Sequence, residues 1–469
     1  MKEFPTVQRL MSLFDRCSTM NHLKQIHARI ILTGYAQHPF VVGKILLFCS
    51  VSVRGDMNYA LSVFDSLQKP DAFLWNTMIR GFSNTTQFHN SIHFYRRMQE
   101  KGAKADNFTL AFLLKVIGGL GSLSLGKQFH CKTIKLGLEN HAYVGNSLMH
   151  MYGMLKDIDT AHQLFERMPN VDLVAWNSII DSHVNCKNYK EALQLFTRMV
   201  QSGIQPDDAT LVVTLSACAA IGALEIGRYI HSCIRNTDLA DITSVCNSLV
   251  GMYAKCGAVD EAYDTFNKTK VKCVVSWNVM IQGLASHGDG KEALAFFSRM
   301  LEENGVRPDE VTFLGVLYAC SHGGMVDEGR RYFDIMSRDF NIQPTMKHYG
   351  CMVDLLARAG LVEEAYNLIE SMPMECNAIV WRTLLAACRV HGYVELGETV
   401  RKKLLKLEPD HSSDYVLLAS MYASAGQWNE MSRERRSMHE RGVQKPKPGN
   451  SFIGISEGSA ESKPIERLL

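Results

Sequence analysis

The sequence predicts an all-α fold, an α-solenoid superhelix of helix-turn-helix repeats. The first observation is that Trp-Asn recurs at 75–76, 176–177 and 277–278, in two steps of 101 residues. A fourth tryptophan, Trp381, follows after 104 residues, with arginine in place of asparagine. The second observation is that apolar residues at helical spacing fill each step. A register kept over this length indicates an internal repeat.

The unit Ala72–Asp106 predicts an antiparallel helix pair of about 35 residues. Its first helix carries apolar residues at i, i+3, i+4 and i+7 from Trp75, which lie on one helical face. A second apolar face follows, and Gly102 ends that helix, because glycine readily adopts the left-handed conformation of a helix C-cap. The copies at Leu173–Asp207 and Val274–Asp309 end in Gly-x-x-Pro-Asp, where proline prevents the helix from continuing.

Two further kinds of unit lie between these copies. Asn107–His141 and Asp208–Ile242 carry Gly-x-Leu-x-x-Gly followed by lysine or arginine. Ala142–Asp172 and Thr243–Cys273 are shorter, with 31 residues each, so the three kinds together fill one step of 101. One such unit alone cannot bury its apolar face, and neighbours must therefore stack. We expect the first helices to line one surface and the second helices the other.

The composition is that of a globular chain. It has 469 residues, of which 46% are hydrophobic and 21% charged, and a net charge of +2 that neither favours nor excludes a nucleic-acid partner. The 13 cysteines include no Cys-x-x-Cys, which favours reduced core cysteines and predicts no metal site. No apolar run is long enough for a membrane span. Repeat-like sequence begins so early that at most a short leader, Met1–Arg9, is expected, without a readable transit peptide.

The residues resemble a plant pentatricopeptide repeat protein of the PLS subfamily, E subclass. The Gly-x-x-Pro-Asp endings and the alternation of three lengths, called P, L and S, carry this resemblance. It implies a right-handed superhelix and extends to about Ile455. The expected order is: leader and partial L-type repeat 1–39, S 40–71, P 72–106, L 107–141, S 142–172, P 173–207, L 208–242, S 243–273, P 274–309, L-type 310–345, S-type 346–377, first E motif 378–411, second E motif 412–445 and tail 446–469.

Nucleotide readout by such arrays uses one base per repeat, through two or three side chains. An asparagine amide both donates and accepts hydrogen bonds, whereas a carboxylate only accepts them. Because uracil carries a donor at N3, an asparagine at the fifth place together with an aspartate at the unit end is expected to favour uracil. An alternative is that each aspartate caps the next helix. Apolar residues at the second place are expected to sandwich bases, with ordinary packing as the alternative. The expected readers are Asn76 with Asp106, Asn146 with Asp172, Asn177 with Asp207, Asn247, and Asn278 with Asp309, and the expected sandwich residues are Phe73, Val174 and Val275.

Other units depart from this pattern. Cys273 replaces aspartate after Asn247, so this unit is expected to prefer a pyrimidine without distinguishing uracil from cytosine. Lys44 is expected at the fifth place of the first short unit, where it reads weakly or contacts phosphate. The remaining fifth places cannot bond a base and are expected to be spacers or protein-binding surfaces: Ala111, Val212, Leu314 and Gly350. The basic residues from Arg401 to Lys406 are either an RNA contact or, the favoured interpretation, a solvated helix face.

The chain is not expected to be an enzyme or to hold a cofactor. A cytidine-deaminase-like domain needs His-x-Glu and Pro-Cys-x-x-Cys, and neither motif occurs. Only 14 residues follow Ile455, and we expect a DYW-type deaminase to act in trans. The resemblance implies a site-recognition factor for C-to-U editing that binds single-stranded organellar RNA, with multiple organellar RNA editing factors on the L-type repeats. The alternatives are a splicing, stability or translation factor and a protein-only scaffold. The expected location is the mitochondrion, with the chloroplast as the alternative.

Overall fold

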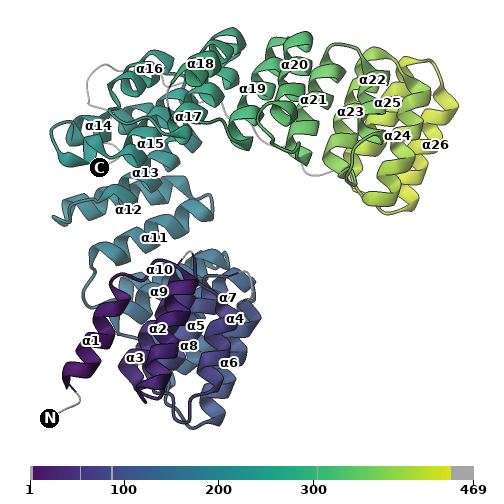
Figure 1. Ribbon diagram of the computed structural model, residues 1–469. Helices are drawn as coiled ribbons and strands as arrows, with labels where there is room; N and C mark the ends of the chain where they lie inside the picture. Colours follow the sequence, from purple (N-terminus) through teal and green to yellow (C-terminus); the bar gives the residue numbers. More distant parts are fainter. Residues whose placement is uncertain (1–3, 53, 86–87, 304, 445–469) are drawn as a thin grey trace. The chain divides into compact units, whose positions relative to one another are not determined.

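The computed structural model describes residues 4–52, 54–85, 88–303 and 305–444. Within these ranges the chain forms 26 α-helices, one short 3-10 helix and no strand, which confirms the all-α prediction (Figure 1). The tail expected at 446–469 lies outside the described residues. The helices belong to two compact units, and the boundary between the units follows Ala217, within α13.

The first unit holds α1 (Phe4–Phe14), α2 (Met20–Leu32), α3 (Pro39–Val51), α4 (Met57–Asp65), α5 (Ala72–Ser83), α6 (Phe88–Glu100), α7 (Asn107–Leu120), α8 (Leu123–Lys135), α9 (Ala142–Met154), α10 (Ile158–Arg167), α11 (Leu173–Asn185), α12 (Tyr189–Gln201) and the start of α13 (Asp208–Ile221). The second unit holds α14 (Leu224–Ile234), the 3-10 helix η1 (Asp238–Asp241), α15 (Thr243–Lys255), α16 (Val259–Lys268), α17 (Val274–Ser286), α18 (Gly290–Glu302), α19 (Glu310–Gly323), α20 (Val326–Arg338), α21 (Met346–Arg358), α22 (Val362–Glu370), α23 (Ala378–His391), α24 (Val394–Leu407), α25 (Ser412–Ser424) and α26 (Trp428–Glu440).

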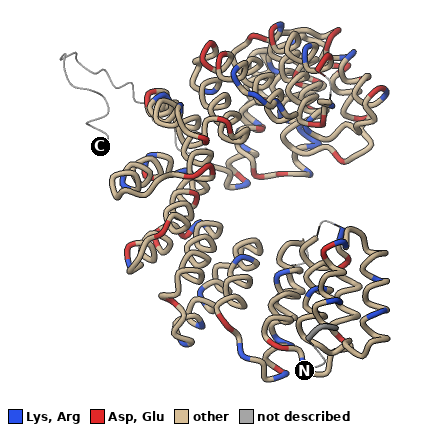
Figure 2. Tube along the Cα trace, turned by 60° about the vertical axis from the view of Figure 1, so that its left-hand side comes forward, with Lys and Arg blue, Asp and Glu red and all other residues tan. Residues whose placement is uncertain are grey.

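Each repeat is a pair of helices that packs on the next pair. In the first unit α5 contacts its own partner α6 and also α7, the first helix of the following repeat, and α7 contacts α9 in the same way. The second unit repeats the pattern, with α17 against α18 and α19. First helices therefore form a continuous row within each unit, as expected for stacked repeats. Charged residues of both signs are interspersed along the helices (Figure 2).

Aspartate and glycine set many of the helix ends. The carboxylates of Asp71 and Asp172 accept hydrogen bonds from backbone N–H groups in the first turns of α5 and α11. Such caps satisfy donors that the helix itself leaves unpaired. Gly102 has φ +72° just after α6, which confirms the expected left-handed ending.

The tryptophans of the repeat bury the interface between successive units. Trp75 contacts the ring of Phe64 on the preceding second helix, with 4.6 Å between ring centroids. The same pairing recurs 101 residues later, with Trp176 4.7 Å from Phe165, and again in the second unit, with Trp277 5.0 Å from Phe266. All three tryptophans are buried. Edge-on aromatic contacts of this kind add to the apolar burial and lock the stacking register.

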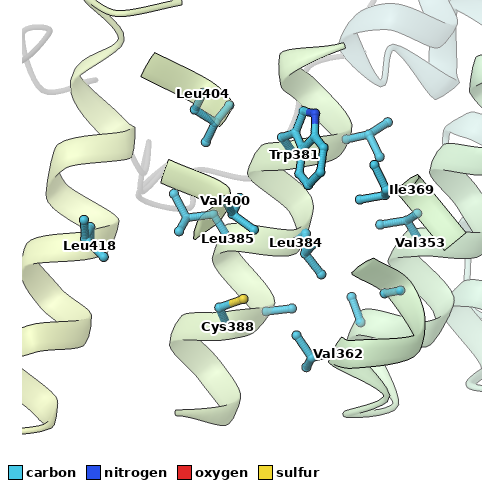
Figure 3. Packing of buried hydrophobic residues seen from close by; sticks show 14 of the residues in the cluster. Val353, Val362, Ile369, Trp381, Leu384, Leu385, Cys388, Val400, Leu404 and Leu418 are labelled. Carbon is cyan, nitrogen blue, oxygen red and sulfur yellow. The ribbon is translucent and has the colours of Figure 1, made fainter. Parts of the chain in front are cut away.

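Trp381 plays the corresponding part near the end of the array. It lies in a buried cluster with Leu384, Leu385 and Cys388 of α23, which meets Val353 and residues of the helices on either side (Figure 3). The cluster continues into α24 and α25. The units expected as the S-type repeat and the two E motifs thus share one core and continue the helical array.

Among the units predicted as P-type, L-type and S-type, first helices approach closely where an S-type unit meets a P-type unit. In α9 a Cβ added to Gly153 would lie 2.5 Å from the Cβ of Ser182 in α11. Added atoms at Gly81 and Gly283 would meet the Cβ atoms of Ser50 and Ala254, each at 2.6 Å. Each junction therefore pairs one glycine with one small residue, and the glycine stands on the S-type side once and on the P-type side twice.

Candidate nucleic-acid interface

Five asparagines occupy the fifth residue of their first helices: Asn76, Asn146, Asn177, Asn247 and Asn278. Asn76, Asn146 and Asn278 are buried, and Asn177 and Asn247 are half-buried. A buried side-chain amide must find hydrogen-bond partners. These partners come from the end of the same unit and from the start of the next.

At the junction of the first P-type and L-type units, three side chains form a closed ring of hydrogen bonds. Asn76 Nδ2 donates to both carboxylate oxygens of Asp106, at 2.9 and 3.0 Å. Thr109 Oγ1 donates to Asn76 Oδ1 at 2.6 Å. Asp106 and Thr109 also bond each other, backbone N–H to side chain, at 2.8 and 3.1 Å. The predicted reader pair is therefore one assembly with a third residue that sequence reasoning missed.

The same ring occurs at the two other P–L junctions. One ring lies in the first compact unit, where Asn177 Nδ2 is 3.0 Å from the Asp207 carboxylate and Asn177 Oδ1 is 2.6 Å from the Thr210 hydroxyl. The other lies in the second compact unit and consists of Asn278, Asp309 and Thr312, with the same two distances of 3.0 and 2.6 Å. The sequence signal was the threonine three residues after each aspartate.

The rings lower the pKa of two of the carboxyls. Burial raises the pKa of Asp207, but hydrogen bonds from the Thr210 N–H, the Thr210 hydroxyl and the Asn177 amide outweigh it, so the pKa lies below its ordinary value. Burial and the bonds from Thr312 and Asn278 act on Asp309 in the same way, with the same result. Donors that point at a carboxylate stabilise its charged form. Both groups therefore stay ionised and serve only as acceptors.

The asparagines of the S-type units are held more loosely. Asn146 Nδ2 lies 3.5 Å from Asp172, and its Oδ1 is buried without a partner among the described residues. Asn247 Nδ2 is 3.8 Å from the Cys273 sulfur, and its Oδ1 is likewise unpartnered within the described part of the chain. Burial raises the pKa of Cys273, but bonds from Ser276 and Asn247 outweigh it and lower the pKa overall.

The alternative interpretation of the aspartates, helix capping, is confirmed for Asp106, Asp172, Asp207 and Asp309. Each side chain accepts a bond from the backbone N–H three residues on, at the start of α7, α11, α13 or α19. The asparagine of the preceding unit donates to the same oxygen, Oδ1, that accepts the capping bond, and at Asp106 also to Oδ2. The two roles therefore coexist.

The second-position residues are exposed. Phe73, Val174 and Val275 keep 55, 57 and 49% of their surface in solvent. Side chains this exposed lie outside the buried core, although the Phe73 ring packs beside Gly43 of the preceding unit. Phe40 and Phe108 are also exposed at the start of their helices, and Phe108 lies 5.6 Å from the ring of Tyr143. An apolar row thus follows the helix starts in the first unit.

The expectation for Lys44 is wrong by one residue. Helix α3 begins at Pro39 after His38, as α9 begins at Ala142 after His141, so Gly43 and not Lys44 takes the place of Asn146. Gly43 is buried, whereas Lys44 is exposed. The fifth place of this unit therefore carries no side chain that can bond a base. Proline at the first helical position misplaced the start of the unit.

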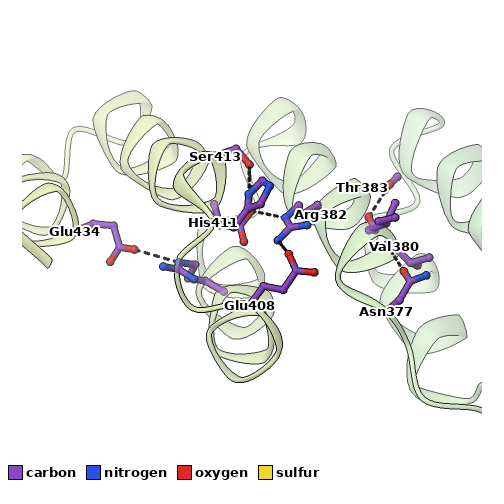
Figure 4. A network of polar contacts seen from close by, with 11 residues as sticks. Asn377, Val380, Arg382, Thr383, Glu408, His411, Ser413 and Glu434 are labelled. Atoms are coloured by element: carbon purple, nitrogen blue, oxygen red, sulfur yellow. Dashed lines mark hydrogen bonds and ion pairs between the residues drawn. The ribbon is translucent and has the colours of Figure 1, made fainter. Parts of the chain in front are cut away.

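In the unit expected as the first E motif, ion pairs replace the polar ring. Arg382, at the place of the asparagine, donates to Asp414 at 2.8 Å and to Glu408 at 2.5 Å (Figure 4). Asp414 is the third residue of α25 and so stands where threonine stands in the rings. Arg401 is buried, lies 3.9 Å from the ring centroid of Tyr415 and bonds Glu434. Both interpretations of the basic run are wrong for Arg401, since it faces neither RNA nor solvent.

Within the described ranges, no group of three or more His, Cys, Asp and Glu side chains is placed to hold a metal ion. Cys388 is buried, and His391 Nε2 lies 3.0 Å from the carbonyl of Ala357. None of the described helices combines the length and apolar character needed to cross a membrane.

An array of helix pairs with polar rings at fixed places defines a helical-repeat protein. Family models match the chain as the PPR repeat family at 171–220 and 272–322, as the PPR repeat at 73–102, 146–172, 244–274, 311–339 and 347–376, and as the E motif at 391–454. The chain belongs to the pentatricopeptide repeat family.

Proteins that are similar to this chain are also named as pentatricopeptide repeat proteins. The chain is 42% identical to pentatricopeptide repeat-containing protein At1g59720, chloroplastic/mitochondrial, of Arabidopsis thaliana, over 97% of this chain and 73% of that one. It is 40% identical to the Arabidopsis protein At2g22410, mitochondrial, over 95% of this chain and 85% of the other. Among solved structures, the maize pentatricopeptide repeat protein PPR10 has 17% identity and a TM-score of 0.47, over 93% of this chain and 74% of that one.

Proposed function

We propose that this protein binds single-stranded organellar RNA and selects a site for C-to-U editing, with a DYW-type deaminase acting in trans. The observation that carries the proposal is the row of asparagines in one register, each followed by its unit-end aspartate or cysteine. A helical array in which five of the units carry such a pair presents polar groups in a fixed register. That is the arrangement needed to read successive bases of a single strand.

Each asparagine that belongs to a ring keeps one N–H and one lone pair beyond those used in the ring. The charged aspartate beside it accepts from the N3–H of uracil, directly or through water. Cytosine offers an acceptor at the same atom and would face the carboxylate unfavourably. Phe73, Val174 and Val275 sandwich the bases by apolar contact, and their exposure supports this role.

Read from the unit at Ala72 to that at Val274, the preferred RNA is U-n-U-U-n-Y-U, 5′ to 3′. The two n positions fall on L-type units, where Ala111 and Val212 offer no polar side chain. Asn247 gives Y because Cys273 stands in place of aspartate. The L-type units serve as spacers and as surfaces for multiple organellar RNA editing factors.

The match to the E motif favours editing over the alternatives of RNA splicing, stability or translation. The asparagine and aspartate rings favour RNA binding over a protein-only scaffold. The named locations of the relatives support an organelle, and we propose the mitochondrion, with the chloroplast as the alternative.

Two measurements test the proposal. Fluorescence anisotropy with the full chain compares U-n-U-U-n-Y-U with RNAs that carry a purine at each U in turn, and the uracil RNA is expected to bind most tightly. Equal binding of the purine RNAs contradicts the readout. Organellar RNA sequencing of a loss-of-function line is expected to show at least one unedited C. Unchanged editing at every C contradicts the editing role while leaving RNA binding intact.

A further inference from the structure

Three buried threonines lie beside the proposed readers without being part of the asparagine and aspartate pairs: Thr109, Thr210 and Thr312. Each belongs to the L-type unit that follows, at the third residue of its first helix. Each hydroxyl nevertheless lies 2.6 Å from Oδ1 of the asparagine in the preceding unit. The hydroxyls therefore face the readers and not solvent.

The proton positions in a ring follow from its donors and acceptors. Thr210 Oγ1 accepts from the N–H of Asp207 at 3.2 Å, and its single proton has two acceptors within reach, Asn177 Oδ1 at 2.6 Å and Asp207 Oδ1 at 2.8 Å. The Asp207 carboxylate only accepts, so it takes the Asn177 Nδ2 proton at 3.0 Å. Every group is satisfied with one orientation of the amide. Turning the amide over would set its oxygen against the carboxylate and would leave the threonine proton only the Asp207 oxygen as an acceptor.

We propose that Thr109, Thr210 and Thr312 are positioning residues that set the choice of uracil over cytosine by fixing which way the reader amide faces. The inference rests on the proposed readout. An amide held with its nitrogen toward the carboxylate keeps an N–H to offer a uracil carbonyl. Cytosine presents an amine there and needs the amide oxygen instead. Because the ring prevents the amide from turning over, the asparagines of these three units cannot present their oxygen to the cytosine amine.

The S-type unit that carries Asn146 supplies the contrast. The third residue after Asp172 is Ala175, which has no hydroxyl, and Asn146 Oδ1 has no partner among the described residues. Its Nδ2 is also farther from the carboxylate, at 3.5 Å. The Asn146 amide is therefore freer to turn, although its unit carries the same asparagine and aspartate as a P-type unit. Two units with the same reader pair should thus discriminate uracil from cytosine unequally.

The first test needs no substitution. Binding of the full chain is measured for U-n-U-U-n-Y-U and for RNAs with C at the third or the fourth nucleotide, which face Asn146 and Asn177. The ratio of the affinities for U and C should be larger at the fourth nucleotide. Equal ratios at the two nucleotides overturn the inference, whereas a chain with no preference for uracil at any reader overturns the proposed function itself.

The second test removes and restores the hydroxyl. Thr210→Val should lower the U-to-C ratio at the fourth nucleotide roughly threefold to tenfold, the scale of one hydrogen bond. The ratio at the first nucleotide, read by Asn76, should not change. Thr210→Ser keeps a hydroxyl and should keep the ratio. A folded Thr210→Val variant with an unchanged ratio, or with equal losses at every nucleotide, overturns the inference.

The third test adds the hydroxyl where it is missing. Ala175→Thr should raise the U-to-C ratio at the third nucleotide, and Ala175→Ser should act in the same direction. This arm decides the matter if loss of the capping contact unfolds the Thr210→Val chain. No increase at the third nucleotide in a folded Ala175→Thr chain overturns the inference.

Discussion

Arg382 donates to the fully buried carboxylate of Asp414 at 2.8 Å, at the two places that asparagine and threonine occupy in the upstream rings. Removing the arginine leaves that carboxylate buried without its cation, which typically costs about 3–5 kcal/mol. Arg382→Met should therefore lower the free energy of unfolding by about that amount, measured by urea denaturation. The double variant Arg382→Met with Asp414→Asn should regain part of the loss.

A matched control is Arg338→Met. Arg338 pairs with Asp339 on the surface, where ion pairs contribute little to stability. If the Arg382 and Arg338 variants are equally stable, the buried pair does not have the role assigned to it here.

Asn177→Ala should weaken binding of U-n-U-U-n-Y-U by about 1–3 kcal/mol, the scale of one good base contact. Wild type and variant should bind equally to an RNA whose fourth nucleotide is abasic. Asn188→Ala serves as the control, because Asn188 is exposed, precedes α12 and makes no side-chain cap. A similar loss in both variants argues against readout by Asn177.

Cys273→Asp should convert a pyrimidine preference at the sixth nucleotide into a preference for uracil. The sulfur already lies 3.8 Å from Asn247 Nδ2 and 3.5 Å from the Ser276 hydroxyl, so a carboxylate there meets donors on both sides. Binding to RNAs with U or C at that nucleotide measures the change. Cys233→Asp, at an exposed cysteine outside the reader row, should leave the ratio as it was.

Stability should depend on pH through Asp207 and Asp309. Their folded pKa values lie below the ordinary 3.8. The unfolded chain therefore binds protons more readily than the folded one. The stabilisation is complete above 3.8 and is lost as the pH falls through the lowered pKa values.

Urea denaturation of the wild type and of Asp309→Asn between about pH 3 and pH 6 checks this dependence. The stability difference between the two should shrink toward acid pH. A difference that stays constant over the range shows that the Asp309 carboxylate is not linked to folding.

The small-residue junctions predict a compensated pair. Gly153→Ser sets two Cβ atoms within 2.5 Å of each other and should destabilise the α9–α11 contact. Ser182→Gly removes the second Cβ, so the double variant should recover most of the lost stability in thermal denaturation. As a control, Gly137→Ser changes a glycine with open space around it, and its effect comes from backbone strain at φ +67°, which Ser182→Gly cannot relieve.

Much of the fold was predictable because residues within each repeat mark where its helices begin and end. Trp75 marks a buried helix face, and Gly102 and the unit-end aspartates mark where helices stop and start. The Thr109 contact was not predicted, because its partner Asn76 belongs to another unit and only stacking brings them together. The Asp-x-x-Thr spacing was visible but indicates a cap equally well.

Two other departures have local causes. Lys44 was misplaced because Pro39 begins a helix at a residue that the repeat spacing assigned to the preceding unit. Arg401 was expected on an outer face because its neighbours in sequence are basic. Its burial depends on Tyr415 and Glu434, which come from the following repeat and are not implied by the local sequence.

The paired small residues at the S–P junctions imply a rule about substitution in this chain. What must stay constant at each junction is the combined size of two side chains on neighbouring helices, so either residue can change only if the other compensates. Glycine has changed sides between Gly81, Gly153 and Gly283 within this one sequence. In an alignment of related repeats, each of the two positions taken alone would therefore look variable. The constraint would become visible only when the two positions are compared together.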